Sequence, residues 1–272
     1  MNMSATPPDV RAKLKRVRLQ LQALDSLLRT FRAEHPYRLQ VSTNPDQTTH
    51  YVRISGAAEV STEAGVIAGE ILYHLRSSLD HIVHSLLVAS GGRDSSSSEF
   101  PIFSNSGEFR HRGIAKIGGL SAAAQTAIEA LQPYHAAAPL TDEWAQSRAA
   151  RADDLFVLHQ LARIDRHRFM AVVRAFIEMK HPVLKPGLDG PTHGGGTSAV
   201  LKDGLLVYHC SYRAPTSPAD VEYPLILHEV LDGEWDERFE VYCEGGTPSV
   251  LDRLTRLTNR VETVVSDLAR LL

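Results

Sequence analysis

The sequence predicts an α+β protein in which a bundle of long helices is combined with a small antiparallel β-sheet. Three observations support this fold class. Four long segments repeat apolar residues with helical spacing, shorter alternating segments lie between turn signals, and the composition is that of an ordinary globular chain, with 43% hydrophobic and 22% charged residues. We expect a single composite domain over residues 1–272, with a helical core at about 9–181 and a β-rich layer and closing helix at about 182–272.

The first predicted helix follows a polar leader, takes Asp9 as its N-cap and ends near His35 and Pro36. Its apolar residues are spaced alternately three and four apart: Leu14, Val17, Leu21, Leu24, Leu28 and Phe31. Its other faces carry a basic set: Arg11, Lys13, Lys15, Arg16 and Arg18. Such a set is typical of a solvated face, and the alternative is a nucleic-acid grip.

A small hairpin is predicted next, with strands at residues 38–42 and 50–55 around a turn-rich segment. The second long helix, at about residues 62–89, carries one apolar stripe: Leu72, Leu75, Leu79, Ile82 and Leu86. Two consecutive glycines at positions 91 and 92 then end the helix.

Two short helices, at about residues 108–117 and 121–131, precede a third long helix that we expect at 152–179. Its stripe consists of Leu155, Leu158, Ala162, Asp165, Phe169, Val172 and Phe176. Asp165 therefore places a carboxylate in an apolar seam, where an unpaired charge costs several kcal/mol. Since Arg76 or a histidine of the second helix is the obvious partner, we expect these two helices to face each other.

The C-terminal third is predicted to be β-rich up to a closing helix. Four strands are expected to form an antiparallel sheet, near residues 198–202, 205–212, 222–231 and 238–243. The dipeptide Asp203-Gly204 is a hairpin turn signal, and the glycine-rich segment 191–196, which lacks the lysine of a P-loop, is expected to be a flexible turn. The closing helix is expected to begin at Thr247-Pro248 and to pack against the first helix.

Charge and cysteine content limit the possible partners. With a net charge of −3, the field of the whole molecule would not attract a phosphate backbone, so any nucleic-acid contact must come from a local patch. Cys210 and Cys243 lack the spacing of a zinc site or a redox pair and are expected to be buried thiols. Because no stretch has the apolar length of a membrane span and no signal peptide is apparent, we expect a cytoplasmic protein without membrane contact.

Polar residues that could carry chemistry concentrate on the second and third long helices. The set comprises Arg76, Asp80, His81 and His84 on the second helix and Asp165 and His167 on the third. Arg76 with Asp80, and Asp80 with His84, are i,i+4 pairs that orient polar groups. A metal site built from the histidines is an alternative, but the paired Glu-x-x-His motifs of di-iron bundles are absent, so we expect neither a metal nor a cofactor.

Residues 76–81, Arg-Ser-Ser-Leu-Asp-His, resemble the Arg-x4-His signature of the HEPN superfamily, whose helical domains are common in bacterial toxin and antiphage systems. The chain also resembles a widespread family of uncharacterised bacterial proteins in four blocks that occur in the same order: Leu75-Arg-Ser-Ser-Leu-Asp-His81, Phe100-Pro-Ile-Phe103, Leu131-Gln-Pro-Tyr134 and Leu161-Ala-Arg-Ile-Asp-Arg-His-Arg168. This second resemblance spans residues 70–170 and implies no activity.

The HEPN resemblance implies a metal-independent ribonuclease, acting on RNA or a nucleotide, whose arginine and histidine meet in the cleft of a homodimer. Carried onto this chain, Arg76 would grip the scissile phosphate, and His81 would move a proton to or from the ribose 2′-OH or the leaving oxygen. The supporting residues would be Asp80, His84, Asp165 and His167. The alternative is a non-catalytic interaction or scaffold protein, with a protein partner, in which the same residues form a structural Arg/Asp/His network.

Overall fold

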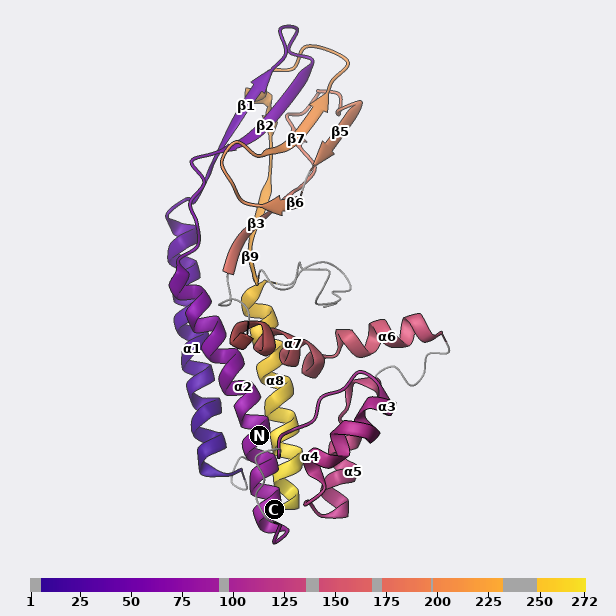
Figure 1. The fold of residues 1–272 in the computed structure, drawn as a ribbon. Helices are drawn as coiled ribbons and strands as arrows, with labels where there is room; N and C mark the ends of the chain where they lie inside the picture. The colour runs from indigo at the N-terminus through magenta and orange to yellow at the C-terminus, as the bar shows by residue number, and fades with distance from the viewer. Residues whose placement is uncertain (1–5, 93–97, 136–141, 168–172, 197, 232–248) are drawn as a thin grey trace. The chain divides into compact units, whose positions relative to one another are not determined.

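The computed structural model describes residues 6–92, 98–135, 142–167, 173–196, 198–231 and 249–272, apart from the side chains of residues 144, 166, 167 and 198. The chain combines long helices with small antiparallel sheets, so the predicted α+β class is confirmed (Figure 1). It divides into two compact units. The helical unit comprises residues 1–25, 63–172 and 231–272, and the β unit comprises residues 26–62 and 173–230.

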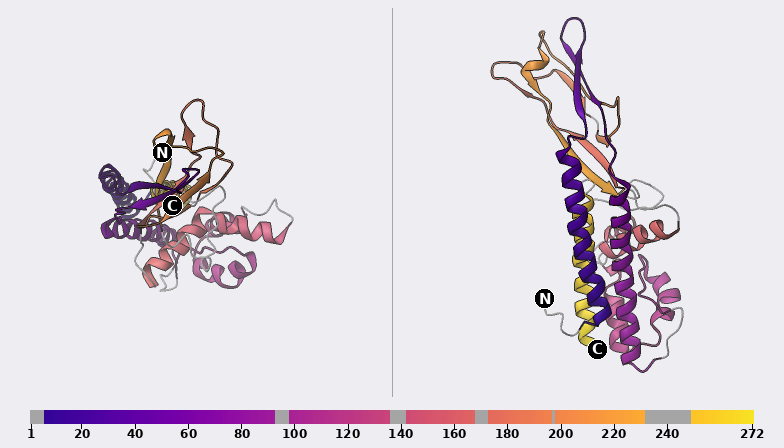
Figure 2. Two further views of the ribbon diagram at one scale, coloured as in Figure 1. Left: turned by 90° about the horizontal axis from the view of Figure 1, so that it is seen from above. Right: turned by 90° about the vertical axis from the view of Figure 1, so that its left-hand side faces the viewer.

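Three long helices run side by side in the helical unit: residues 8–25 of α1 (Pro8–Ala33), α2 (Thr62–Ala89) and α8 (Val250–Leu268) (Figures 1 and 2). The apolar stripes predicted for the first two helices are buried, except that Leu21 is half-buried, and Leu24, Leu75 and Leu257 are fully inaccessible. Arg18 of α1 donates two hydrogen bonds, of 2.8 and 2.7 Å, to Glu262 of α8. The predicted packing of the closing helix against the first is therefore confirmed.

The ends of two of these helices differ from the predictions. Asp9 lies inside the first turn of α1, which begins at Pro8, and is therefore not its N-cap. The described part of α8 is capped by Ser249, whose hydroxyl accepts a 3.1 Å hydrogen bond from the backbone N–H of Asp252. The predicted start at residues 247–248 lies outside the described residues.

Short helical elements follow α2 where they were predicted. They are α3 (Ser106–Glu108), a π-helical turn (Phe109–Gly113), α4 (Ile114–Ile117), α5 (Ala122–Ala130) and a 3-10 turn (Pro133–His135). Ser121 caps α5, since its side chain accepts a hydrogen bond from the backbone N–H of Ala124.

The prediction of one helix over residues 152–179 is wrong. The segment contains the end of α6 (Glu143–Ala152), then α7 (Asp154–His167) and strand β3 (Val173–Met179). Asp153 separates the helices because its backbone is extended and its carboxylate accepts a 2.8 Å hydrogen bond from the N–H of Leu155. In β3, alternate residues are buried, as in a strand: Val173, Ala175 and Ile177. The sequence did not reveal this strand, because a short apolar run can belong either to a strand or to a helix.

The described residues of the β unit form three small sheets. The four-stranded sheet has the order β1 (Arg38–Thr43), β2 (Thr49–Ser55), β7 (Leu206–Ser211), β5 (His193–Gly196), with antiparallel neighbours. The other sheets comprise β6 (Ser198–Val200), β3 and β9 (Leu225–Leu231), and β4 (Val183–Leu184) with β8 (Val221–Glu222). The predicted hairpin of residues 38–55 is confirmed, and further predicted strands correspond to β6, β7 and β9.

Two predictions in the glycine-containing segments of the β unit are wrong. The turn at Asp203-Gly204 exists, with Gly204 at a φ of +72°, but β6 and β7 on either side of it belong to different sheets, so it does not form a hairpin. The segment expected to be a flexible turn contains β5. Its glycines permit close packing, since a Cβ at Gly194 would lie 2.5 Å from the hydroxyl oxygen of Tyr208.

Other predictions concern the cysteines and the membrane. Cys210 is fully buried, as expected, whereas Cys243 and the strand predicted at 238–243 lie outside the described residues. Across the part of the chain that the structure describes, no helix is both long enough and apolar enough to cross a membrane.

Candidate functional site

Arg76 is buried on α2 and binds the segment that follows this helix. Its side chain is 5% exposed, and its Nη2 donates a 2.8 Å hydrogen bond to the backbone carbonyl of Phe100. The same nitrogen lies 3.1 Å from Oδ1 of Asp80, which accepts a 3.0 Å hydrogen bond from the backbone N–H of Phe100. The predicted i,i+4 pair is therefore present, and together its members bind both backbone polar groups of Phe100.

Gln132 also binds the backbone of this segment. Its Oε1 accepts a 3.0 Å hydrogen bond from the N–H of Phe103, and its Nε2 donates a 2.8 Å bond to the carbonyl of Pro101. We call Arg76, Asp80 and Gln132 the backbone clamp. Three of the sequence blocks that carry the family resemblance, at residues 75–81, 100–103 and 131–134, therefore contact one another through this clamp.

His81 lies on a different face of α2 from Arg76. Five residues along a helix correspond to a rotation of about 140°. His81 consequently contacts α1, where its Nδ1 lies 2.5 Å from Oδ2 of Asp9, and its side chain is 42% exposed. Partial burial is the largest single influence and raises the pKa of Asp9, but the hydrogen bond with His81, the backbone hydrogen bonds and the charge of His81 together lower it. Within one chain, Arg76 and His81 therefore do not converge on one point.

The predicted proximity of the second and third helices is present at Asp165. A Cβ at Gly69 of α2 would lie 2.7 Å from Oδ1 of Asp165, so Asp165 packs closely against the backbone of α2. Gly69 is about two turns from Arg76. His84 is exposed, and the side chain of His167 lies outside the described part of the structure.

A cavity of about 360 Å³ opens beside the backbone clamp, and we call it the basic cleft. Residues 99–116 and helix α7 form most of its wall. Its charged lining consists of the cations Arg76, Arg112, Lys116 and Arg163 and the carboxylates of Glu99 and Glu108. Cations outnumber carboxylates, so the cleft is a local positive patch on a chain whose net charge is −3.

The cations of the basic cleft differ in how they are paired. Lys116 contacts Glu99, and this contact lowers the pKa of Glu99 although burial acts to raise it. Arg112 and Arg163 are exposed, and neither has a carboxylate partner among the residues that the structure describes. These two guanidinium groups are therefore available to an anion in the cleft.

His159 of α7 lies in the same cleft and was not among the residues singled out from the sequence. Burial, followed by the charges of Arg76 and Arg163, lowers its pKa to about 4. Its Nδ1 is buried and has no hydrogen-bond partner in the described part of the chain. The imidazole is thus neutral at pH 7, and it is a weak base until a bound anion offsets the charges of Arg76 and Arg163 and raises its pKa. The place of His159 in the cleft is visible only from the packing of α7 beside residues 99–116, because the sequence around His159 carries no distinguishing motif.

The described residues contain no group of three or more His, Cys, Asp or Glu side chains that could hold a metal ion. No protein-family model, curated protein or solved structure matches the chain. The resemblance to HEPN proteins therefore stays a prediction, and the functional argument depends on the side chains of the basic cleft.

Proposed function

We propose that this protein is an RNA-directed, HEPN-like protein, a metal-independent ribonuclease of a defence or toxin system, and that the basic cleft is its phosphate site. The observation that carries this proposal is the presence in one cleft of a half-buried, neutral histidine and of two exposed arginines that have no carboxylate partner among the described residues. Cleavage of RNA without a metal requires cations to hold the phosphate and a neutral base to take a proton from the 2′-OH.

The cleft suggests a role for each of its polar side chains. Arg163 and Arg112 bind the phosphate oxygens, and His159 accepts the proton of the 2′-hydroxyl, whose oxygen attacks phosphorus. The bond from phosphorus to the 5′-oxygen then breaks, and this oxygen takes a proton from solvent or from a second histidine. Arg76 acts as a positioning residue, because its guanidinium is engaged by the backbone of Phe100.

The pair that the HEPN resemblance implies, Arg76 with His81, belongs to a second version of the same proposal. His81 faces Asp9 and lies outside the lining of the cleft, so it would reach a bound phosphate only from a second copy of the chain. That version requires the homodimer expected from the HEPN resemblance. The two versions therefore assign the proton transfer to different histidines.

The test is cleavage of a labelled RNA oligonucleotide by the full chain in the presence of a chelator. We expect His159→Ala to lower the rate by roughly 10²–10⁴-fold and Arg163→Ala to weaken RNA binding. His111→Ala is the matched control, since His111 is exposed and does not line the cleft. Loss of cleavage in His81→Ala instead of His159→Ala would favour the dimeric version, and absence of any cleavage or RNA binding by the unaltered protein would reject both.

A non-catalytic scaffold or interaction protein is the second candidate function. The backbone clamp favours it, because Arg76, Asp80 and Gln132 all use their polar groups to hold one segment of the same chain. In that case Arg76→Ala would lower stability, and neither His159→Ala nor Arg163→Ala would change any interaction with RNA.

A further inference from the structure

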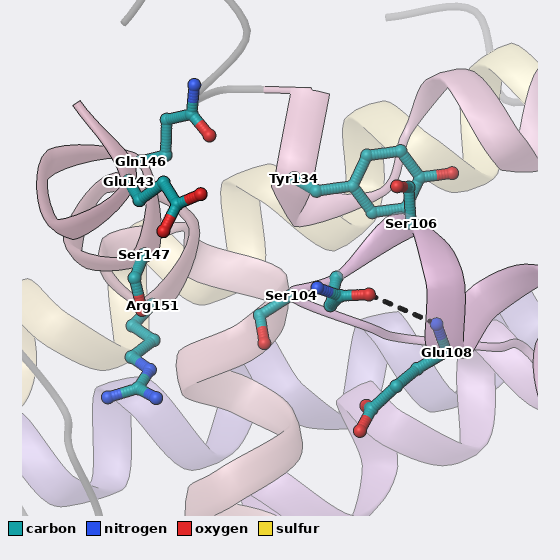
Figure 3. A pocket seen from close by; sticks show the side chains of 9 residues that line it. Ser104, Ser106, Glu108, Tyr134, Glu143, Gln146, Ser147 and Arg151 are labelled. Carbon is teal, nitrogen blue, oxygen red and sulfur yellow. Dashed lines mark hydrogen bonds between the residues drawn. The ribbon is translucent and has the colours of Figure 1, made fainter. Parts of the chain in front are cut away.

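A second and larger hollow adjoins the basic cleft. It has a volume of about 840 Å³ and lies between residues 104–108, Tyr134 and one face of helix α6 (Figure 3). Ser104 and Glu108 line both the hollow and the cleft, so the two cavities share a wall within the helical unit. We call the larger one the polar hollow.

The polar hollow is lined by groups of a different kind from those of the basic cleft. Helix α6 contributes Gln146, Ser147 and Arg151, and these side chains lie across the hollow from Tyr134 and Ser106 (Figure 3). Together the lining supplies an amide, hydroxyls, a guanidinium and the carboxylates of Glu108 and Glu143, groups that can hydrogen bond to the edges of a base and to ribose hydroxyls. A volume of this size is within the range of small-molecule sites.

Besides a tilted ring contact with His135 at a centroid distance of 4.5 Å, two contacts hold Tyr134 in place. Its ring packs edge-on against Phe109, with centroids 6.0 Å apart, and its hydroxyl donates a 3.4 Å hydrogen bond to Glu129. Asn105 accepts hydrogen bonds of 2.7 and 3.2 Å from the backbone N–H groups of Gly107 and Glu108. An aromatic ring held in this way beside hydroxyl and amide groups is a surface on which a base can stack.

We propose that the basic cleft and the polar hollow form one nucleotide-binding groove. The cleft holds the phosphate near Arg112 and Arg163, and the polar hollow holds the attached ribose and base, with the base against Tyr134. The proposal rests on the proposed function, because it extends the same phosphate site. It adds that the ligand is recognised as a nucleotide and not only as an anion.

The experiment measures binding of inorganic phosphate, AMP and UMP to the full chain by calorimetry. We expect each nucleotide to bind at least about tenfold more tightly than phosphate, since stacking and base-edge contacts are added. Tyr134→Leu and Gln146→Ala should each weaken nucleotide binding, the former by about tenfold, and should leave phosphate binding unchanged. Tyr134→Phe keeps the ring and serves as the conservative control, and Arg163→Ala should weaken both ligands.

Different results separate this inference from the proposed function. The proposal of a nucleotide-binding groove would be overturned by equal affinities for phosphate and nucleotides. It would also be overturned if Gln146→Ala and a folded Tyr134→Leu both bound nucleotides as tightly as the unaltered protein. If Arg163→Ala still weakened phosphate binding, the phosphate site itself would stand. Failure of all three ligands to bind would overturn both the groove and the phosphate site.

Discussion

Replacing Arg76 with alanine tests whether the backbone clamp is structural. The change removes the 2.8 Å hydrogen bond to the carbonyl of Phe100 and the 3.1 Å contact with Asp80. A hydrogen bond from a charged donor contributes roughly 1.5–3 kcal/mol, and the buried carbonyl is left without this donor. We therefore expect the free energy of unfolding to fall by about 3 kcal/mol, which lowers the melting temperature by roughly 6–12 °C.

The assay is thermal and urea unfolding followed by circular dichroism. Asp80→Asn is the comparison, because the amide oxygen can still accept the hydrogen bond from the N–H of Phe100 and the Asp80 side chain is 30% exposed. We expect Asp80→Asn to lower the free energy of unfolding by about 1 kcal/mol or less. The exposed Arg163 provides the control, and Arg163→Ala should stay within about 0.5 kcal/mol of the unaltered protein. An Arg76→Ala protein that melts within 1 °C of the unaltered chain would refute the structural role.

Three further predictions follow from close packing and from charge. Gly69→Val should lower the free energy of unfolding by roughly 1–3 kcal/mol, since the new Cβ would lie 2.7 Å from Asp165 Oδ1, and urea unfolding measures the change. Gly194→Val should destabilise β5, whose backbone lies against the hydroxyl of Tyr208, as seen in faster amide exchange of that strand. His159, with a pKa of about 4 in the folded chain and about 6.5 when unfolded, should make stability fall as the pH drops from about 6.5 towards 4, because the unfolded state binds more protons in that window.

Each of these predictions has a control and a contradicting result. Gly118→Ala is the control for the helical unit, since its nearest neighbour would be a carbonyl oxygen 3.5 Å away, and Gly190→Ala is the control for the β unit, because a Cβ there meets nothing within 4 Å. Substitutions at Gly69 or Gly194 that cost no more than these would contradict the packing argument. His159→Gln should reduce the loss of stability between pH 6.5 and 4, and an unchanged pH profile in that variant would show that other groups cause it.

The elements that could be predicted are those whose pattern is local. Helices α1, α2 and α8 were read from apolar residues spaced three and four apart, and the hairpin of residues 38–55 from two alternating segments around a turn. The error over residues 152–179 arose because Val173–Met179 is a strand that pairs with β6 and β9, whose residues lie twenty or more positions further along the chain. Sequence periodicity over a short apolar run does not specify such a partner.

In the candidate site too, contacts between residues close in the sequence could be predicted, and contacts between distant residues could not. The pairing of Arg76 with Asp80 follows from helical spacing alone, and the carboxylate of Asp165 in an apolar seam correctly indicated that α7 faces α2. Neither observation predicted that the Arg76–Asp80 pair would bind the backbone of Phe100. The contact between His81 and Asp9 joins residues 72 positions apart, and no local pattern indicated it.

The sequence by itself thus determined the α+β class, the long helices and the crowded polar face of α2, because a helix repeats every 3.6 residues and orients side chains that are close in the chain. Only the tertiary structure decided that Arg76 is buried by the 100–103 segment, that His81 points away from it, and that His159 and Arg163 share a cleft with Arg112 and Lys116. The physical reason is that convergence of distant side chains depends on how helices pack, and packing is set by the whole buried core.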